Sequence, residues 1–179
     1  MLEVKDWEEF WKDSEAIKLA AYIRKKYMDY KRNIEKREIS PIKLQKSLYF
    51  LFAYWGKFIR ENRENPDSVE VDYSSYNEYL FDDKIEAWTY GPVIPSVFSA
   101  EKCEFLPFVD IDGYLAEDHI KREFIDDLLH QLFAISDFSL VDLSHQDECW
   151  KNYYIENDKK HNREIPKEDI INEYCIKSA

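Results

Sequence analysis

The feature that most constrains the fold of this chain is a helix that is apolar on almost every side. Ser40-Pro41 predicts its start, because a serine hydroxyl caps free backbone N–H groups and proline suits the first helical position. Large apolar side chains then recur at helical spacing: Leu44, Leu48, Leu51, Phe52, Trp55, Phe58 and Ile59, widened by Tyr49, Phe50 and Tyr54. A helix of this kind is surrounded by protein. We therefore predict a central helix from Leu44 to Ile59, in which Gly56 allows a neighbour to approach closely.

Other segments predict helices around that centre. Ser14 is a suitable N-cap for a long helix whose apolar face extends to Ile34, and residues 4–12 can form a short amphipathic one. A further helix is predicted at 118–135, with Ile120, Phe124, Leu128, Leu132 and Ile135 on one core-facing stripe and Ile125, Leu129 and Phe133 beside it. Ser139 can cap a short turn. Pro95 precedes a short helical piece, and Pro166 suits the first turn of the last helix.

The stretch from Tyr79 to Phe98 concentrates the turn and strand signals. Asp82-Asp83 predicts a turn, Ile85 to Tyr90 reads as a strand, and Gly91-Pro92 is expected to end it in a rigid corner. A second strand is permitted at 69–73, where it could pair with the first. We expect Trp88, Tyr90, Gly91 and Pro92 to be scaffold, and the acidic turn and an exposed strand edge to be available for partner contact.

These elements predict an α+β fold that is mainly α-helical. The composition is 45% hydrophobic and 16% aromatic, which is enough apolar material for a substantial core. No linker-like stretch or internal repeat divides the sequence. We therefore expect a single compact domain over residues 1–179, built around the central buried helix with a small antiparallel sheet.

The charge of the chain is strongly polarised. The formal net charge is −12, but residues 1–64 hold 15 Lys and Arg against 11 Asp and Glu, so the remaining residues carry −16. An acidic balance argues against nucleic acid as the main partner, because phosphate binding depends on Lys and Arg. The basic cluster comprises Arg24, Lys25, Lys26, Lys31, Arg32, Lys36 and Arg37. It is interpreted first as a solvated helix face and second as a contact for an acidic partner or RNA.

Cysteine usage and hydropathy favour a cytoplasmic protein. Cys103, Cys149 and Cys175 show no CxxC spacing, so neither a disulfide framework nor a zinc ribbon is indicated. No apolar segment has the pattern of a signal peptide or the length of a membrane span. We expect a cytoplasmic location without membrane contact.

Few residues suggest catalysis. His145, Asp147, Glu148 and Cys149 form the one tight group of metal-capable or nucleophilic side chains, and their spacing matches no metal-ligand signature. A structural histidine at a helix end is the favoured interpretation. Glu86 could act as a general acid if it were buried, but nothing fixes a partner for it. A small hydrolase using Glu86 or the His145 and Cys149 pair remains an alternative, although we expect no catalytic residue, cofactor or metal.

Three separated segments together resemble one family, the SocA-like antitoxins with a Panacea domain, often described as phage-associated. Lys43 to Phe50, KLQKSLYF, resembles its KLQKLLYY helix, and Phe81 to Pro95 resembles its hallmark, in which an acidic turn leads into I-E-A-W-P-Y-G-P-V. Leu143-Ser144-His145, with Trp150 and a terminal helix from Ile165 to Cys175, resembles its closing pattern. The resemblance spans about residues 16–176. The sequence differs from the usual family pattern at Ser47 and at Thr89, and its segment from Arg60 to Tyr79 is longer than is typical of the family.

The resemblance implies an antitoxin that neutralises a protein toxin, usually encoded next to it, by direct contact and without catalysis. Some members of the family act as adaptors that hand the toxin to a cytoplasmic protease. The motif positions, as possible interface residues, are Lys43, Gln45, Lys46, Tyr49, Asp82, Asp83, Glu86, Trp88, Tyr90, Gly91, Pro92, His145 and Trp150. A further alternative is a phage or mobile-element protein that binds a host factor through the basic cluster.

Overall fold

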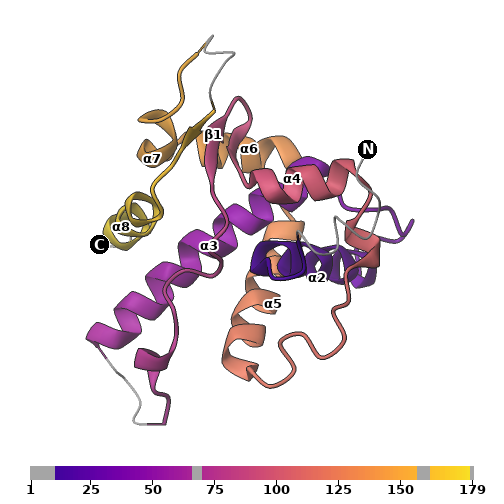
Figure 1. Ribbon diagram of the computed structural model, residues 1–179, viewed down its shortest axis with the longest axis horizontal. Helices are drawn as coiled ribbons and strands as arrows, with labels where there is room; N and C mark the ends of the chain where they lie inside the picture. The colour runs from indigo at the N-terminus through magenta and orange to yellow at the C-terminus, as the bar shows by residue number, and fades with distance from the viewer. Residues whose placement is uncertain (1–10, 66–69, 157–161, 178–179) are drawn as a thin grey trace.

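Helix α3 (Pro41–Glu64) forms the centre of the structure, a computed structural model that describes residues 11–65, 70–156 and 162–177. Ser40 caps it, accepting a hydrogen bond from the backbone N–H of Lys43 at 3.0 Å. Five helices pack against it: α2 (Glu15–Asp29), α4 (Pro95–Lys102), α5 (His119–Phe133), α6 (Asp137–His145) and α8 (Lys167–Lys177). Figure 1 shows α8 on one side of α3, and α2 and α5 on the other. The predicted central helix is confirmed.

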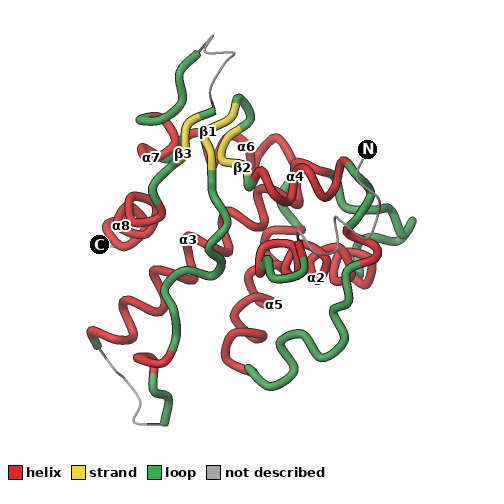
Figure 2. Tube along the Cα trace, viewed as in Figure 1, coloured by secondary structure: helices red, strands yellow, loops and turns green. Residues whose placement is uncertain are grey.

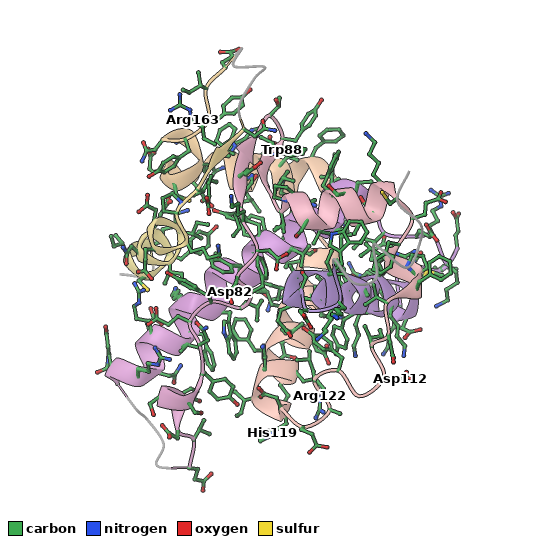
Figure 3. The ribbon with its side chains drawn as sticks, viewed as in Figure 1. Asp82, Trp88, Asp112, His119, Arg122 and Arg163 are labelled. Atoms are coloured by element: carbon green, nitrogen blue, oxygen red, sulfur yellow. The ribbon has the colours of Figure 1, made fainter. Side chains whose placement is uncertain are left out.

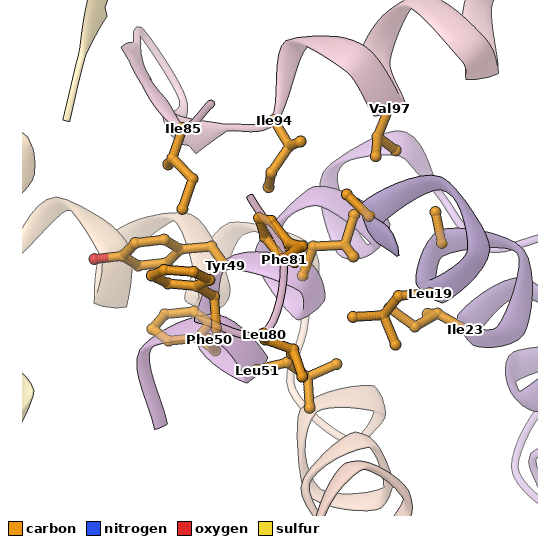
Figure 4. Close-up of a cluster of buried hydrophobic side chains, with 14 of the residues drawn as sticks. Leu19, Ile23, Tyr49, Phe50, Leu51, Leu80, Phe81, Ile85, Ile94 and Val97 are labelled. Carbon is orange, nitrogen blue, oxygen red and sulfur yellow. The ribbon is translucent and has the colours of Figure 1, made fainter. Parts of the chain in front are cut away.

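The core is built from large side chains of α3 and of the elements around it. Every residue of α3 from Lys43 to Ala53 is buried. In the part of the core drawn in Figure 4, Tyr49, Phe50 and Leu51 of α3 lie among side chains from the segments on either side of the hairpin, from α4 and from α2. Those neighbours are Leu80, Phe81, Ile85, Ile94, Val97, Leu19 and Ile23. Burial of such side chains contributes about 1.5 to 3 kcal/mol each to the free energy of folding. The prediction of a helix surrounded by protein holds from Lys43 to Ala53, where every residue is buried.

A small antiparallel sheet lies at one end of α3, with strand order β2-β1-β3. Strand β1 (Glu86–Trp88) pairs with β2 (Gly91–Val93) on one edge and with β3 (Arg163–Glu164) on the other. Figure 2 shows the three strands together, with β3 arriving from the C-terminal part of the chain. The mainly helical α+β fold is therefore confirmed, whereas the edge of β1 that we expected to be exposed is covered by β3.

Two details of the predicted strands are wrong. Gly91-Pro92 does not end the first strand but starts the second one, because β1 ends at Trp88 and the turn is made by Thr89 and Tyr90. The second predicted strand, at 69–73, is not formed by its described residues 70–73. Tyr73–Ser75 instead forms a 3₁₀ turn, η1, which Asp72 caps by accepting from the backbone N–H of Ser74. Short polar side chains that bond the local backbone favour a turn over a strand.

The boundaries of the other helices follow their caps. Ser14 caps α2 as predicted, but the helix ends at Asp29 and Ile34 is 84% exposed. The side chain of Asn33 forms hydrogen bonds with backbone groups of Tyr27 and Arg37. These bonds stabilise a loop in the segment where the apolar periodicity predicted that the helix would continue.

The predicted helices at 118–135 and after Pro166 are confirmed as α5 and α8. Helix α6 begins after Ser136 rather than at a cap formed by Ser139, because the Ser136 hydroxyl accepts from the backbone N–H of Ser139. A short helix, α7 (Glu148–Lys151), follows α6, and the 3₁₀ turn η2 (Leu106–Phe108) follows α4.

The helix expected at 4–12 lies outside the described residues except for its last positions. No helix among the described residues is both long and apolar enough to cross a membrane.

Gly56 confirms the predicted close approach of a neighbour. A Cβ at this position would lie 2.5 Å from Cγ1 of Ile171 in α8. We expect Gly56→Ala to lower the free energy of unfolding by about 1 kcal/mol, because overpacking costs about 1 to 3 kcal/mol while the better helix propensity of alanine returns about 1. Urea unfolding of Gly56→Ala, Ile171→Ala and the double variant measures the coupling. Strictly additive effects would contradict the assigned contact.

Candidate functional site

The polar motif residues of α3 are buried, and each holds a different neighbouring element. Lys43 Nζ donates to the carbonyl oxygens of Phe133, at 3.1 Å, and Ile135, at 2.6 Å. The ammonium group therefore caps the C-terminal end of α5, where a helix carries its negative partial charge. Gln45 bonds both backbone groups of Ile94, accepting from N at 2.8 Å and donating to O at 3.2 Å. These two side chains fix α5 and the end of the hairpin to α3.

Lys46 is the most deeply buried cation of the described residues, with 1% of its surface exposed. Its Nζ donates to the carbonyl oxygen of Pro92 at 2.7 Å, which ties β2 to α3. Burial lowers the pKa of the Lys46 amine from 10.5 to about 7, because the charged form loses its hydration.

The lowered pKa of Lys46 predicts a pH-dependent stability. Between about pH 7 and pH 10.4 the unfolded chain holds a proton on Lys46 that the folded chain releases, so stability rises with pH in this range. From pH 7 to pH 9 the free energy of unfolding of the wild type should rise by about 2 kcal/mol relative to Lys46→Met. Urea unfolding of both proteins at several pH values measures this difference. Parallel pH profiles would mean that the buried amine stays charged at neutral pH.

Tyr49, the last of these motif residues on α3, belongs to a buried polar cluster around Asp147. The Asp147 carboxylate accepts hydrogen bonds from the hydroxyls of Tyr49, at 2.5 Å, and Tyr174, at 2.7 Å, and forms an ion pair with Lys177. Asp147 is 1% exposed, and its partners come from α3 and α8. Burial raises the pKa of both tyrosines, and the charge of Asp147 and the hydrogen bonds to it act in the same direction, so the hydroxyls remain donors. We refer to these four side chains as the Asp147 cluster.

His145 and Trp150 hold the β1–β2 hairpin from the other side. Their rings stack with centroids 4.2 Å apart, and the ring of Tyr154 stacks on Trp150 in turn. His145 Nε2 lies 3.0 Å from the carbonyl oxygen of Thr89, and Trp150 Nε1 donates to the carbonyl oxygen of Trp88 at 2.9 Å. These contacts agree with the interpretation of His145 as a structural residue at the end of α6.

The group predicted from sequence around His145 is divided by the structure. The imidazole of His145 faces the hairpin, whereas Cys149 is buried with its Sγ 3.4 Å from the hydroxyl of Tyr49. Burial raises the pKa of the Cys149 thiol, which is the opposite of what a nucleophilic thiolate requires. Among the described residues, no three His, Cys, Asp or Glu side chains are placed to hold a metal ion.

The three acidic motif residues, Asp82, Asp83 and Glu86, lie in different environments. Asp83 accepts hydrogen bonds from the hydroxyls of Ser14, at 2.9 Å, and Ser96, at 2.6 Å, so it links the starts of α2 and α4. Asp82 is exposed, and Figure 3 labels it on the segment that leads into β1. Glu86 is half-buried in β1, opposite Val93 and Glu164 in the strand register.

The hairpin corner is buried on one side only. Gly91 and Pro92 are buried, Tyr90 is 59% exposed, and the half-buried ring of Trp88 packs edge-on against Phe98 with centroids 4.9 Å apart. Figure 3 labels Trp88 within the sheet.

We expect Trp88→Ala to lower the free energy of unfolding by about 1 to 3 kcal/mol, which is less than for a fully buried tryptophan because the side chain is already partly exposed. Thermal unfolding should show a melting temperature several degrees lower, while the matched change Tyr90→Ala has little effect. An unchanged melting temperature together with lost partner binding would assign Trp88 to an interface.

An apolar groove of about 530 Å³ opens between α3, α5, α6 and α8. The sequence pattern assigned one stripe of α5 to the core, but only Leu132 of that stripe is fully buried, while Phe124, Leu128 and Ile135 are half-buried and line the groove. The core side of α5 is formed by Ile125, Leu129 and Phe133, which stood beside the predicted stripe. We call this space the α5 groove. Its remaining lining is Phe50, Tyr54, Asp127, Gln131, Leu132, Leu143, Gln146, Asp147, Tyr174 and Lys177.

Sequence reasoning missed both the groove and the Asp147 cluster. Tyr174 and Lys177 carry no local signal that pairs them with Asp147, because the three side chains meet only after α8 has packed on α3. The signal that could have indicated the groove is the width of the apolar surface of α5. Two adjacent stripes are more than one helix face needs for the core.

Comparison with known proteins gives one family. Residues 70–151 match the family model described as "Antitoxin SocA-like, Panacea domain". The match confirms the resemblance inferred from the sequence, and it includes the β1–β2 hairpin and the elements from α4 to α7, whereas α3 and α8 lie outside it. No curated protein and no solved structure matched the chain.

Proposed function

We propose, from the match of residues 70–151 to the SocA-like antitoxin family, that this chain is an antitoxin that neutralises a protein toxin by binding it directly. The family match is the observation that carries this proposal. A toxin encoded by the neighbouring gene is the expected partner, and the cytoplasm is the expected location.

The described contacts support a binding role for the surface rather than for the motif residues of α3. The polar groups of four buried motif residues form hydrogen bonds with neighbouring elements of the same chain, namely those of Lys43, Gln45, Lys46 and Tyr49. Their burial makes them unavailable to a partner that docks on the folded protein. The α5 groove, in contrast, leaves half-buried apolar side chains open to solvent. Open apolar surface of this kind is typical of protein-binding sites.

Co-expression tests the proposal. The protein encoded by the neighbouring gene is induced alone and together with this chain, and growth is measured. Arrested growth that recovers when this chain is present, with a stable complex of the two proteins on size-exclusion chromatography, is the expected result. A neighbour without toxicity, or toxicity that persists at full expression of this chain, would refute the antitoxin function.

A role as a proteolytic adaptor would require a further result. If this chain hands the toxin to a cytoplasmic protease, the half-life of the toxin falls when the chain is present and rises again in cells that lack the protease. If the chain only blocks the toxin, neutralisation occurs at an unchanged toxin half-life. Pulse-chase labelling of the toxin distinguishes the two.

A further inference from the structure

The α5 groove has the properties of a docking surface for one class of partner segment. Its rim includes Tyr54 and Leu143, which are 40% and 42% exposed, and its wall carries the half-buried stripe of α5. Helix α5 thus presents one apolar stripe to the core and a second one to the groove. The described parts of the chain cover this second stripe only in part, because Phe124 packs against Trp55 and Phe58 while Leu128 and Ile135 are half-buried at the groove.

The walls of the groove favour a helical partner over an extended one. They are formed by α3, α5, α6 and α8, whose backbone N–H and C=O groups are bonded within their own helices. Such walls offer side-chain contacts but no free strand edge. A segment that binds there has to satisfy its own backbone hydrogen bonds, which an α-helix does and a single strand does not.

The charge of the groove favours a basic partner. Lys177 is neutralised by the Asp147 carboxylate and lies 3.6 Å from Glu173. Asp127, at the groove, is exposed and forms no ion pair with another described residue. The groove therefore holds one carboxylate that no described cation pairs with, and most of the residues that line the groove come from the part of the chain after residue 64, which carries a net charge of −16. Complementary charge favours Lys or Arg beside the apolar face of the partner.

We propose that the α5 groove binds an amphipathic helix of the toxin, with its apolar face against Leu128 and its neighbours and with Lys or Arg opposite Asp127. This inference rests on the proposed antitoxin function and adds to it the surface and the chemistry of the partner segment. It assigns no role in toxin binding to the basic cluster on α2 and the loop that follows it.

Two groove variants and two matched controls test the proposal. Asp127→Arg reverses an exposed charge, and Leu128→Glu places a charge on the apolar stripe. Asp29→Arg and Ile34→Glu make the same kinds of change at exposed positions outside the groove. Affinity for the purified neighbouring-gene protein is measured by calorimetry, with circular dichroism and melting temperature as the check on folding. The groove variants should weaken binding at least tenfold, and Asp127→Arg should do so at an unchanged melting temperature, while the controls stay within twofold.

Photocrosslinking identifies the occupant. A benzophenone amino acid at position 128 should crosslink to one segment of the neighbouring-gene protein, and that segment should have Leu, Ile or Phe at helical spacing flanked by Lys or Arg. Wild-type affinity in folded Asp127→Arg and Leu128→Glu would overturn the assignment of the groove and leave the antitoxin function intact. A crosslink to a second copy of this chain, or to an extended or acidic segment, would overturn the assigned occupant. A wild-type chain that neither binds nor neutralises would refute the proposed function, and this inference with it.

Discussion

Asp147→Ala is expected to lower the free energy of unfolding by about 3 to 5 kcal/mol, the largest effect of any single polar substitution in this protein. The carboxylate is buried and accepts from the hydroxyls of Tyr49 and Tyr174 while it pairs with Lys177. Removing it leaves two buried hydroxyls without their acceptor, which is costly, and takes one of two carboxylate partners from Lys177, which keeps Glu173 at 3.6 Å. Urea unfolding followed by circular dichroism measures the change.

Two further variants separate the cluster from a general effect of losing an aspartate. Asp147→Asn retains one acceptor oxygen, so it should cost less than alanine but still weaken the bonds to the two tyrosines. Asp142→Ala removes an exposed carboxylate from the neighbouring helix and should change stability by no more than about 0.5 kcal/mol. A loss below about 1 kcal/mol for Asp147→Ala would show that desolvation of the carboxylate cancels most of what its bonds contribute.

Gly91→Ala is expected to destabilise the protein by about 3 kcal/mol or more. Gly91 has φ +101°, a conformation that residues with a Cβ rarely adopt, and it is buried at the start of β2. A Cβ there would lie 2.3 Å from Oγ of Ser144 and 3.1 Å from Nζ of Lys46. The substitution therefore adds backbone strain and a clash with two buried side chains, that of Lys46, which ties β2 to α3, and that of Ser144 in α6.

Gly113 offers the matched control for Gly91. It also has a positive φ, +74°, but a Cβ at this position meets no atom within 4 Å. Gly113→Ala should then cost only the strain of about 1 to 2 kcal/mol. The excess cost of Gly91→Ala measures the clash, and combining it with Ser144→Ala should recover part of that excess. Equal costs at the two glycines would mean that the hairpin shifts freely on α3.

The parts of the fold that depend on neighbouring residues could be predicted from the sequence. Ser14 and Ser40 were recognised as caps because their bonds reach only three residues ahead. The burial of α3 followed from the sequence because a helix with apolar side chains on all sides has no other stable environment. Gly56 was assigned to a close approach for a similar reason, since glycine inside a helix costs stability unless a neighbour needs the space.

The parts that depend on distant residues could not be predicted. Strand β3 pairs with β1 across more than 70 residues of sequence, and its two residues, Arg163 and Glu164, give no strand signal. The motif positions were recognised on α3, but their tasks were not, because the partners of Lys43, Gln45 and Lys46 are backbone carbonyl or N–H groups. Such groups occur at nearly every position and leave no trace in the sequence.

The position of α3 in the chain has a consequence for synthesis. The central helix is made early, and α8, which packs over Gly56, begins about 100 residues after α3 ends. At about 5 to 20 residues per second, a nascent chain would carry the apolar surface of α3 without its last cover for roughly 5 to 20 seconds. During that interval the incomplete chain presents the surface that chaperones and proteases bind. We therefore expect the yield of folded protein to depend in part on events that precede the synthesis of α8.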